Sequence, residues 1–140
     1  MGFGVAAAIG AKLAKQDRNV VCITGDGAFQ MYMRELGTAR QHDAPITYVI
    51  LNNSCLGWIK VLQQRMGERY VCSSFDPSPD FAKIASAYEC YGENVYKPSD
   101  IKPALRRALD ANRHGIPAAV SFTVDWTEVP SGFNYYYGSD

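Results

Sequence analysis

The chain has 140 residues, enough for one domain with a substantial hydrophobic core. Hydrophobic residues make up 47% of it, which excludes a disordered chain, and its 14 basic and 14 acidic residues cancel to a net charge of zero. A nucleic-acid-binding protein usually needs a basic face, so this balance argues against one. No apolar run reaches the roughly 18 residues that would span a bilayer.

Two features favour a cytoplasmic location. The apolar stretch 1–14 lacks the basic leader of a secretory signal peptide, so we interpret it as a buried helix. The four cysteines form no C-x-x-C pair, so the sequence indicates neither a zinc site nor a redox motif. A reducing compartment is consistent with this pattern.

Helices and strands are predicted to alternate along the chain. Helical periodicity and capping residues predict helices at 4–15, 31–42, 80–85 and 99–112. Short β-branched runs predict strands at 19–24, 45–51, 93–96 and 118–124. Nearly continuous apolar strands that alternate with helices are typical of parallel sheets joined by right-handed crossovers. We therefore predict an α/β domain over 1–125, with an open, mostly parallel sheet and helices on both faces, followed by an irregular tail over 126–140.

Polar side chains follow two of the predicted strands. Asp26 comes after strand 19–24, and Asn53 comes after strand 45–51. If the two strands are neighbours, both side chains project from the carboxyl edge of the sheet, where open α/β folds bind ligands. A carboxylate and an amide oxygen suit Mg²⁺, which prefers hard oxygen ligands.

The surrounding residues suit a phosphate group. Gly25 and Gly27 permit a tight turn and a close backbone approach, and a helix beginning near Ala28 would direct free N–H groups at an anion. No Lys or Arg lies beside the loop, which argues for a diphosphate held through Mg²⁺ and against a Walker loop. Gly-Asp-Gly and Asn-Asn are each common turn sequences, so only their combination at two strand ends is specific.

The motif Gly25-Asp26-Gly27 followed by Asn52-Asn53 resembles the signature of thiamine-diphosphate-dependent enzymes. The segments MGFGVAAAIGA (1–11) and NNSCLG (52–57) are similar to the acetolactate synthase branch. The resemblance spans about residues 1–125. It implies the C-terminal diphosphate-binding domain of a larger enzyme, with thiamine diphosphate and Mg²⁺ as cofactors. It also implies decarboxylation or carboligation of a 2-oxo acid.

The same resemblance implies individual roles. Asp26 and Asn53 would be side-chain ligands of Mg²⁺, and Cys55 would offer its backbone carbonyl. Met1 would wedge the cofactor into its bent form. The remaining positions expected to bind the cofactor are Gly2, Gly25, Gly27, Ala28, Leu56, Gly57 and Trp58.

One catalytic group is expected from elsewhere. In the resembled family a glutamate from a different domain, usually on a neighbouring subunit, activates the aminopyrimidine ring. The candidates in this chain lie in no matching motif, so we predict no catalytic residue here: Glu35, Glu68, Glu89, Glu93 and Glu128. The expected partner is a pyrimidine-binding domain of the same or another chain, in a homo- or hetero-oligomer.

Some readings remain open. Leu62 stands where acetolactate synthases often carry a tryptophan that shapes the acceptor pocket, so the acceptor could differ. The chain could also be a catalytically silent binding or scaffolding module, or could bind another phosphorylated ligand. Gly2 to Ala7 match the dinucleotide fingerprint G-x-G-x-x-A, but no predicted strand precedes them as that motif requires.

Overall fold

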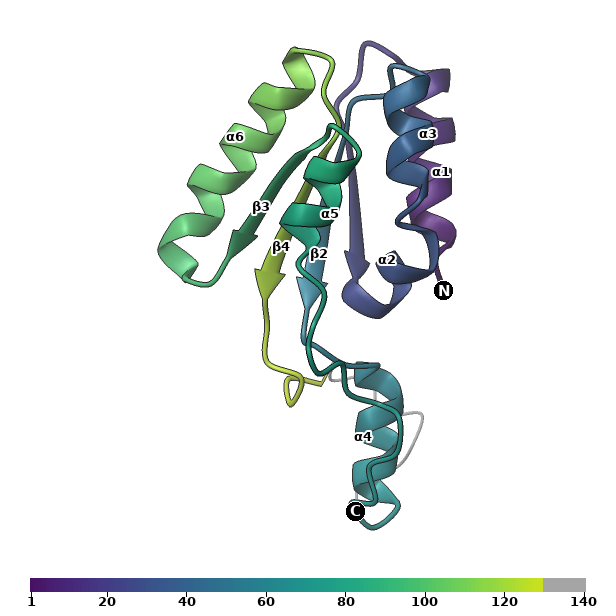
Figure 1. Ribbon diagram of the computed structural model, residues 1–140, viewed down its shortest axis with the longest axis vertical. Helices are drawn as coiled ribbons and strands as arrows, with labels where there is room; N and C mark the ends of the chain where they lie inside the picture. Colours follow the sequence, from purple (N-terminus) through teal and green to yellow (C-terminus); the bar gives the residue numbers. More distant parts are fainter. Residues whose placement is uncertain (130–140) are drawn as a thin grey trace.

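A computed structural model of the chain describes residues 1–129. Its centre is a single sheet of order β1-β2-β4-β3, in which every pair of neighbours is parallel. The strands are β1 (Val20–Gly25), β2 (Ile46–Asn52), β3 (Tyr91–Val95) and β4 (Ala118–Thr123). The predicted open, parallel α/β sheet is therefore confirmed (Figure 1).

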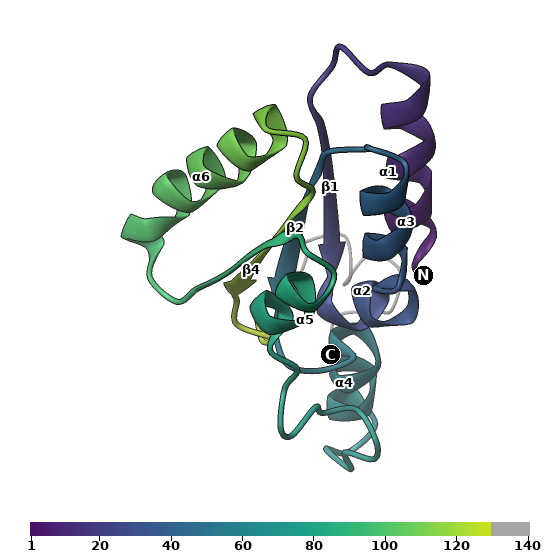
Figure 2. The ribbon, with the colours of Figure 1, turned by 45° about the horizontal axis from the view of Figure 1, so that its top comes forward.

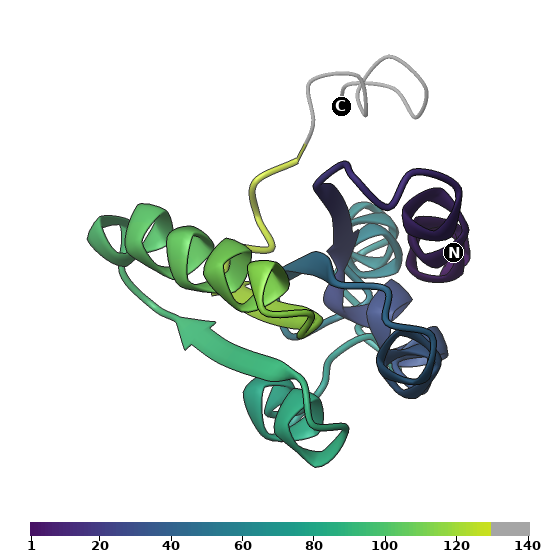
Figure 3. The ribbon, with the colours of Figure 1, turned by 90° about the horizontal axis from the view of Figure 1, so that it is seen from above.

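Helices cover both faces of this sheet, as predicted. The helices of the described chain are α1 (Phe3–Ala14), α2 (Asp26–Tyr32), α3 (Glu35–Gln41), α4 (Gly57–Arg65), α5 (Phe81–Ala87) and α6 (Ile101–Arg113), the last preceded by the 3-10 turn η1 (Pro98–Asp100). All of them except α4 lie against the sheet. The helices α1, α2, α3 and α5 contribute to one hydrophobic cluster, and α6 contributes to another on the opposite face. Figure 3 shows α6 separated from the other helices by the strands.

The alternation of side chains along the strands creates these two clusters. Tyr48 of β2 is fully buried, and the centroid of its ring lies 5.8 Å from that of Phe29. The ring of Phe29 lies in turn 5.7 Å from that of Phe81. On the other face Val120 of β4 packs with Ala104 and other small residues of α6. A parallel sheet needs both faces covered, and these nearly continuous apolar strands supply the required side chains.

Two predicted helix boundaries hold in detail. Asp80 caps α5, because its side chain accepts a hydrogen bond of 3.2 Å from the backbone N–H of Lys83. After α6 the chain turns at Gly115, which has a φ of 78°. Glycine adopts this left-handed conformation without steric cost, so it ends the helix where the sequence indicated.

Three features differ from the predictions or lie beyond them. The predicted helix 31–42 is two helices, α2 and α3, separated at Met33 and Arg34. The helix α4 was not predicted, and it projects away from the sheet (Figure 1). Within the predicted tail, 126–129 form no helix or strand, and 130–140 lie outside the described residues. None of the described helices has the length and apolar character needed to cross a membrane.

A cavity at the carboxyl edge of the sheet

The parallel pairing of β1 with β2 brings the two polar motifs together. Gly25 at the end of β1 lies opposite Leu51 in β2, so Asp26 and Asn53 leave the sheet at the same edge. A cavity of about 660 Å³ lies at this edge. The predicted site residues that line it are Met1, Gly25, Asp26, Gly27, Ala28, Asn53, Cys55, Leu56, Gly57 and Trp58.

Asp26 is the buried acid of this cavity. Asp26 is only 2% exposed. One of its carboxylate oxygens, Oδ1, accepts a hydrogen bond of 2.9 Å from the backbone N–H of Gly27. The other oxygen, Oδ2, is buried without a hydrogen-bond partner among the described residues. Burial raises the pKa of the Asp26 carboxyl, and the backbone N–H groups of Gly27, Ser54 and Cys55 oppose that shift. A buried carboxylate oxygen without a partner is costly, and a bound cation would satisfy it.

The loop that follows β2 is held in a defined shape. Asn53 Oδ1 accepts hydrogen bonds from the N–H of Cys55 at 3.3 Å and from its thiol at 3.4 Å. Ser54 has a φ of 55°, an uncommon conformation for a residue other than glycine. Its carbonyl accepts a hydrogen bond of 2.8 Å from Phe75, which ties the loop to a second segment. The backbone oxygens of this loop therefore keep fixed positions beside Asp26.

The thiol of Cys55 is poorly suited to bind a metal. Burial raises the pKa of this thiol, so it stays protonated at neutral pH, whereas a metal binds the thiolate. The part of Cys55 suited to a hard cation is its carbonyl oxygen.

The charged side chains that line the cavity have one sign. Of the described residues that line it, Asp26, Asp125 and Glu128 are acidic, and none is Lys, Arg or His. The described residues also include no group of three His, Cys, Asp or Glu side chains placed to hold a metal ion. A cation at Asp26 would therefore take its other protein ligands from amide and carbonyl oxygens, which are ligands that Mg²⁺ accepts.

Gly2 is the predicted site residue that does not line the cavity. It is buried and has a φ of 79°, and a Cβ there would lie 2.1 Å from the ring of Tyr32. Close packing between the start of the chain and α2 explains a glycine at this position. The neighbouring Met1 is 81% exposed and does line the cavity.

Sequence reasoning did not predict several cavity residues: Leu51, Ile59, Val124, Asp125 and Glu128. Val124 and Asp125 follow β4, which lies directly beside β2 on the side opposite β1. Their position could have been inferred from the same carboxyl-edge argument, but only with the strand order known. Glu128, one of the five glutamates that lie in no matching motif, also lines a smaller adjoining pocket together with Trp58.

Comparison with known protein families shows to which family the chain belongs. Residues 1–122 match the family described as the thiamine pyrophosphate enzyme, C-terminal TPP binding domain. The chain belongs to this family. The prediction from the Gly25-Asp26-Gly27 and Asn52-Asn53 motifs is thereby confirmed at the level of the family and its cofactor.

Relatives of this TPP-binding domain include large subunits of acetolactate synthases. The chain is 40% identical over 129 residues to the acetolactate synthase isozyme 3 large subunit of Escherichia coli, which is 91% of the chain and 22% of that protein. It is 38% identical over 126 residues to a probable acetolactate synthase large subunit of Methanococcus aeolicus, which is 89% of the chain and 20% of that protein. The chain thus spans about a fifth of these relatives.

A solved structure shares the fold of the domain. The thiamine diphosphate-dependent 4-hydroxybenzoylformate decarboxylase of Rhodococcus jostii superimposes with a TM-score of 0.78 at 27% identity. The match covers 92% of this chain and 24% of that enzyme.

Proposed function

We propose that this TPP-binding domain holds the diphosphate of thiamine diphosphate through Mg²⁺. The protein ligands of the metal are the side chains of Asp26 and Asn53 and the backbone carbonyl of Cys55. The buried Asp26 Oδ2, which has no hydrogen-bond partner among the described residues, is the observation that carries this proposal. The acidic cavity, with no basic residue in its described lining, supports it, because a diphosphate needs a cation to enter such a site.

The other cavity residues position the cofactor. Ala28, in the first turn of α2, offers its backbone N–H to the diphosphate. Gly27, whose own N–H donates to Asp26, and Gly25 line the cavity without side chains and leave room for the cofactor. Met1 supports the bend of the cofactor. Leu56, Gly57 and Trp58 form the wall next to the substrate and exclude water from it. Gly2 acts through its packing on Tyr32, which fixes the position of Met1.

The chemistry is that of a 2-oxo acid enzyme related to acetolactate synthase. Bound thiamine diphosphate serves as an electron sink for decarboxylation or carbon–carbon bond cleavage. We infer that this domain, residues 1–125 with the tail 126–140, works within an oligomeric cytoplasmic enzyme of the lyase or transferase type. A pyrimidine-binding domain of the same or another chain supplies the activating glutamate.

Calorimetric titration with thiamine diphosphate and Mg²⁺ tests the proposal. The unaltered chain should bind the cofactor only when Mg²⁺ is present. Asp26→Ala should weaken binding by at least about 100-fold, because it removes the only charged ligand of the metal. Asp110→Ala, which removes an exposed carboxylate on α6, is the matched control and should leave the titration unchanged.

The competing functions give different titrations. If the chain is a silent scaffolding module, the unaltered chain and Asp26→Ala give the same flat trace. If it binds another phosphorylated ligand, a nucleoside diphosphate displaces thiamine diphosphate at comparable concentration.

A further inference from the structure

Few buried apolar contacts hold the helix α4. Val61 is its only buried residue, and the helix extends away from the sheet, with the segment that follows it running back at its side (Figure 2). The side chain of Gln63 donates a hydrogen bond of 2.9 Å to the carbonyl of Val71 in that segment and accepts one of 3.2 Å from the N–H of the same residue. The two pieces of chain are therefore joined by polar contacts.

Lys60 of α4 is the point at which three parts of the chain meet. Its Nζ lies 4.4 Å from the centroid of the Trp126 ring, which belongs to the segment that follows β4. Nζ also lies 5.7 Å from the centroid of the Tyr70 ring and donates a hydrogen bond of 3.0 Å to the hydroxyl of Ser74, both in the segment that follows α4. The rings of Tyr70 and Trp126 meet edge to face, 6.2 Å apart between centroids. These four residues are the Lys60 cluster.

The charge of Lys60 stabilises this cluster. An ammonium group over the face of an aromatic ring, within about 6 Å of its centroid, is attracted by the electrons of the ring. None of the salt bridges among the described residues involves Lys60. The charge therefore has the two rings and the hydroxyl of Ser74 as its partners in the described chain.

The segment after β4 holds Trp126 in a defined position. Val124 donates a backbone hydrogen bond of 2.9 Å to the carbonyl of Asn52, which continues the pairing of β4 with β2. The carboxylate of Asp125 accepts hydrogen bonds from the backbone N–H of Thr127 at 2.9 Å and from its hydroxyl at 2.8 Å. These two bonds form a tight turn with Trp126 at its centre.

Both segments that meet Trp126 and Lys60 line the proposed cofactor cavity. Trp58 and Ile59 of α4 line it, and so do Asp125 and Glu128 after β4. The smaller adjoining pocket, of about 190 Å³, likewise lies between α4 and the segment that contains Trp126. Since 124–129 form no helix or strand, the contact between Trp126 and Lys60 joins this wall of the cavity to α4.

We propose that Lys60 is a positioning residue for this cavity. Its ammonium group holds Trp126, and with it Asp125 and Glu128, against α4, so that the acidic wall keeps its place before a ligand binds. Lys60 lines neither the cavity nor the smaller pocket, so it acts through Trp126. The effect on cofactor binding rests on the proposed function, whereas the effect on Trp126 does not.

Tryptophan fluorescence of the 140-residue chain tests the Lys60 cluster without a ligand. Trp58 and Trp126 are the two tryptophans of the chain, so Trp58→Phe leaves Trp126 as the single emitter. In this background Lys60→Met keeps the aliphatic stem and removes the charge, and it should raise the quenching of Trp126 by acrylamide at least about twofold. Lys60→Arg should match the background, because a guanidinium also stacks on aromatic rings.

Calorimetric titration with thiamine diphosphate and Mg²⁺ connects the cluster to the cavity. In the otherwise unaltered chain Lys60→Met should weaken binding by about two- to fivefold, because the cofactor must then order the segment after β4. Lys60→Arg should retain the affinity. Lys102→Met, which removes an exposed lysine of α6, is the matched control and should change neither quenching nor binding.

Two results would overturn the positioning role. One is equal quenching of Trp126 in the background chain and in its Lys60→Met variant. The other is increased quenching in Lys60→Met with an unchanged affinity for the cofactor. A flat titration of the unaltered chain would overturn the proposed Mg²⁺ site, and protection of Trp126 that depends on Lys60 would still support the cluster.

Discussion

Gly57 stands where any side chain would collide with a proposed metal ligand. A Cβ at this position would lie 2.5 Å from Nδ2 of Asn53, so the side chain of Asn53 can occupy its place only beside a glycine. The same side chain accepts a hydrogen bond from Cys55, which shapes the loop next to Asp26. Gly57 is therefore a positioning residue for the proposed Mg²⁺ site.

Gly57→Ala should weaken Mg²⁺-dependent binding of thiamine diphosphate by about 10- to 100-fold, because it displaces Asn53 and its loop. The measurement is the calorimetric titration, repeated with increasing Mg²⁺. A higher concentration of Mg²⁺ should recover part of the affinity for thiamine diphosphate. The displacement of Asn53 weakens the binding of Mg²⁺ directly, and it weakens the binding of the cofactor only through the metal.

Gly10→Ala is the control for this substitution. Gly10 lies within α1, and a Cβ there would meet no atom within 4 Å. Alanine is the better helix former, so this variant should bind as the unaltered chain does and unfold at a slightly higher temperature. Equal binding by Gly57→Ala and Gly10→Ala would contradict the positioning role.

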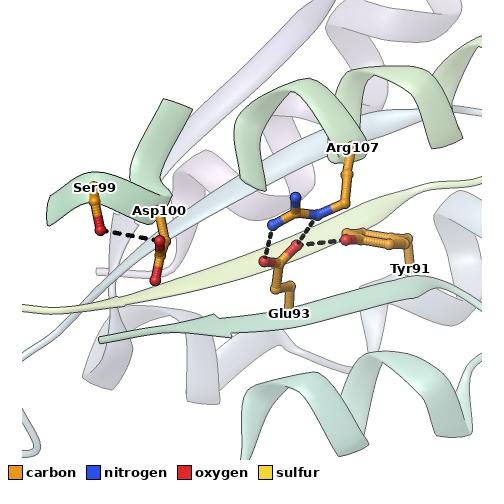
Figure 4. Close-up of polar contacts among 5 residues, drawn as sticks. All are labelled: Tyr91, Glu93, Ser99, Asp100 and Arg107. Carbon is orange, nitrogen blue, oxygen red and sulfur yellow. Dashed lines mark hydrogen bonds and ion pairs between the residues drawn. The ribbon is translucent and has the colours of Figure 1, made fainter. Parts of the chain in front are cut away.

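At the scale of the elements, a polar cluster joins β3 to α6 (Figure 4). Arg107 of α6 donates two hydrogen bonds to Glu93 of β3, one of them from Nε at 3.0 Å, and the hydroxyl of Tyr91 also donates to Glu93. The hydrogen bond from Arg107 lowers the pKa of the Glu93 carboxyl in the folded chain. Glu93, which the resemblance left without a catalytic role, thus has a structural one.

The lowered pKa sets the pH dependence of this contribution. Because the pKa of Glu93 is lower in the folded chain than its ordinary value of 4.5, the ionised carboxylate stabilises the fold at pH values above 4.5. This stabilisation is lost as the pH falls through the lowered pKa of the folded chain. Glu93→Gln should therefore lower Tm by about 1–3 °C at neutral pH, a small amount because the pair is partly exposed. The difference from the unaltered chain should shrink below about pH 4.5.

Thermal unfolding at a series of pH values measures this effect. Glu68→Gln removes an exposed glutamate in the segment after α4 and serves as the control, with no such pH-dependent difference. A Glu93→Gln difference that stayed constant down to pH 3.5 would show that the ion pair does not cause it.

The strands could be predicted because buried parallel strands need uninterrupted apolar runs, and β2 and β4 have them. The separation of α2 from α3 could not be predicted from the sequence. Met33 and Arg34 keep helical backbone angles, and only the hydrogen-bond pattern changes between the two helices. The helix α4 escaped prediction because Val61 is its only buried residue, which leaves little amphipathic pattern. Asp125 at the cavity required the strand order, which depends on long-range pairing.

At the scale of the whole molecule, the cavity would supply one half of the proposed active site. The cavity is acidic, and its described lining includes no basic group that would pair with the carboxylate of a 2-oxo acid. The exposed side chains of Met1, Trp58 and Ile59 surround the same cavity, at 81%, 46% and 44% exposure. Apolar groups around an open cavity are suited to contact with another domain, which would close the site against water.

The last prediction is that turnover requires this second half. The 140-residue chain with thiamine diphosphate and Mg²⁺ should release no CO₂ from pyruvate above background. Addition of the part of the E. coli isozyme 3 large subunit that lies outside the segment matched by this chain should raise the rate at least ~100-fold, because a positioned acid–base group contributes that much. The same mixture made with Asp26→Ala should stay silent. Robust turnover by the chain alone would refute the claim that the activating glutamate comes from elsewhere, since the five described glutamates would then have to include it.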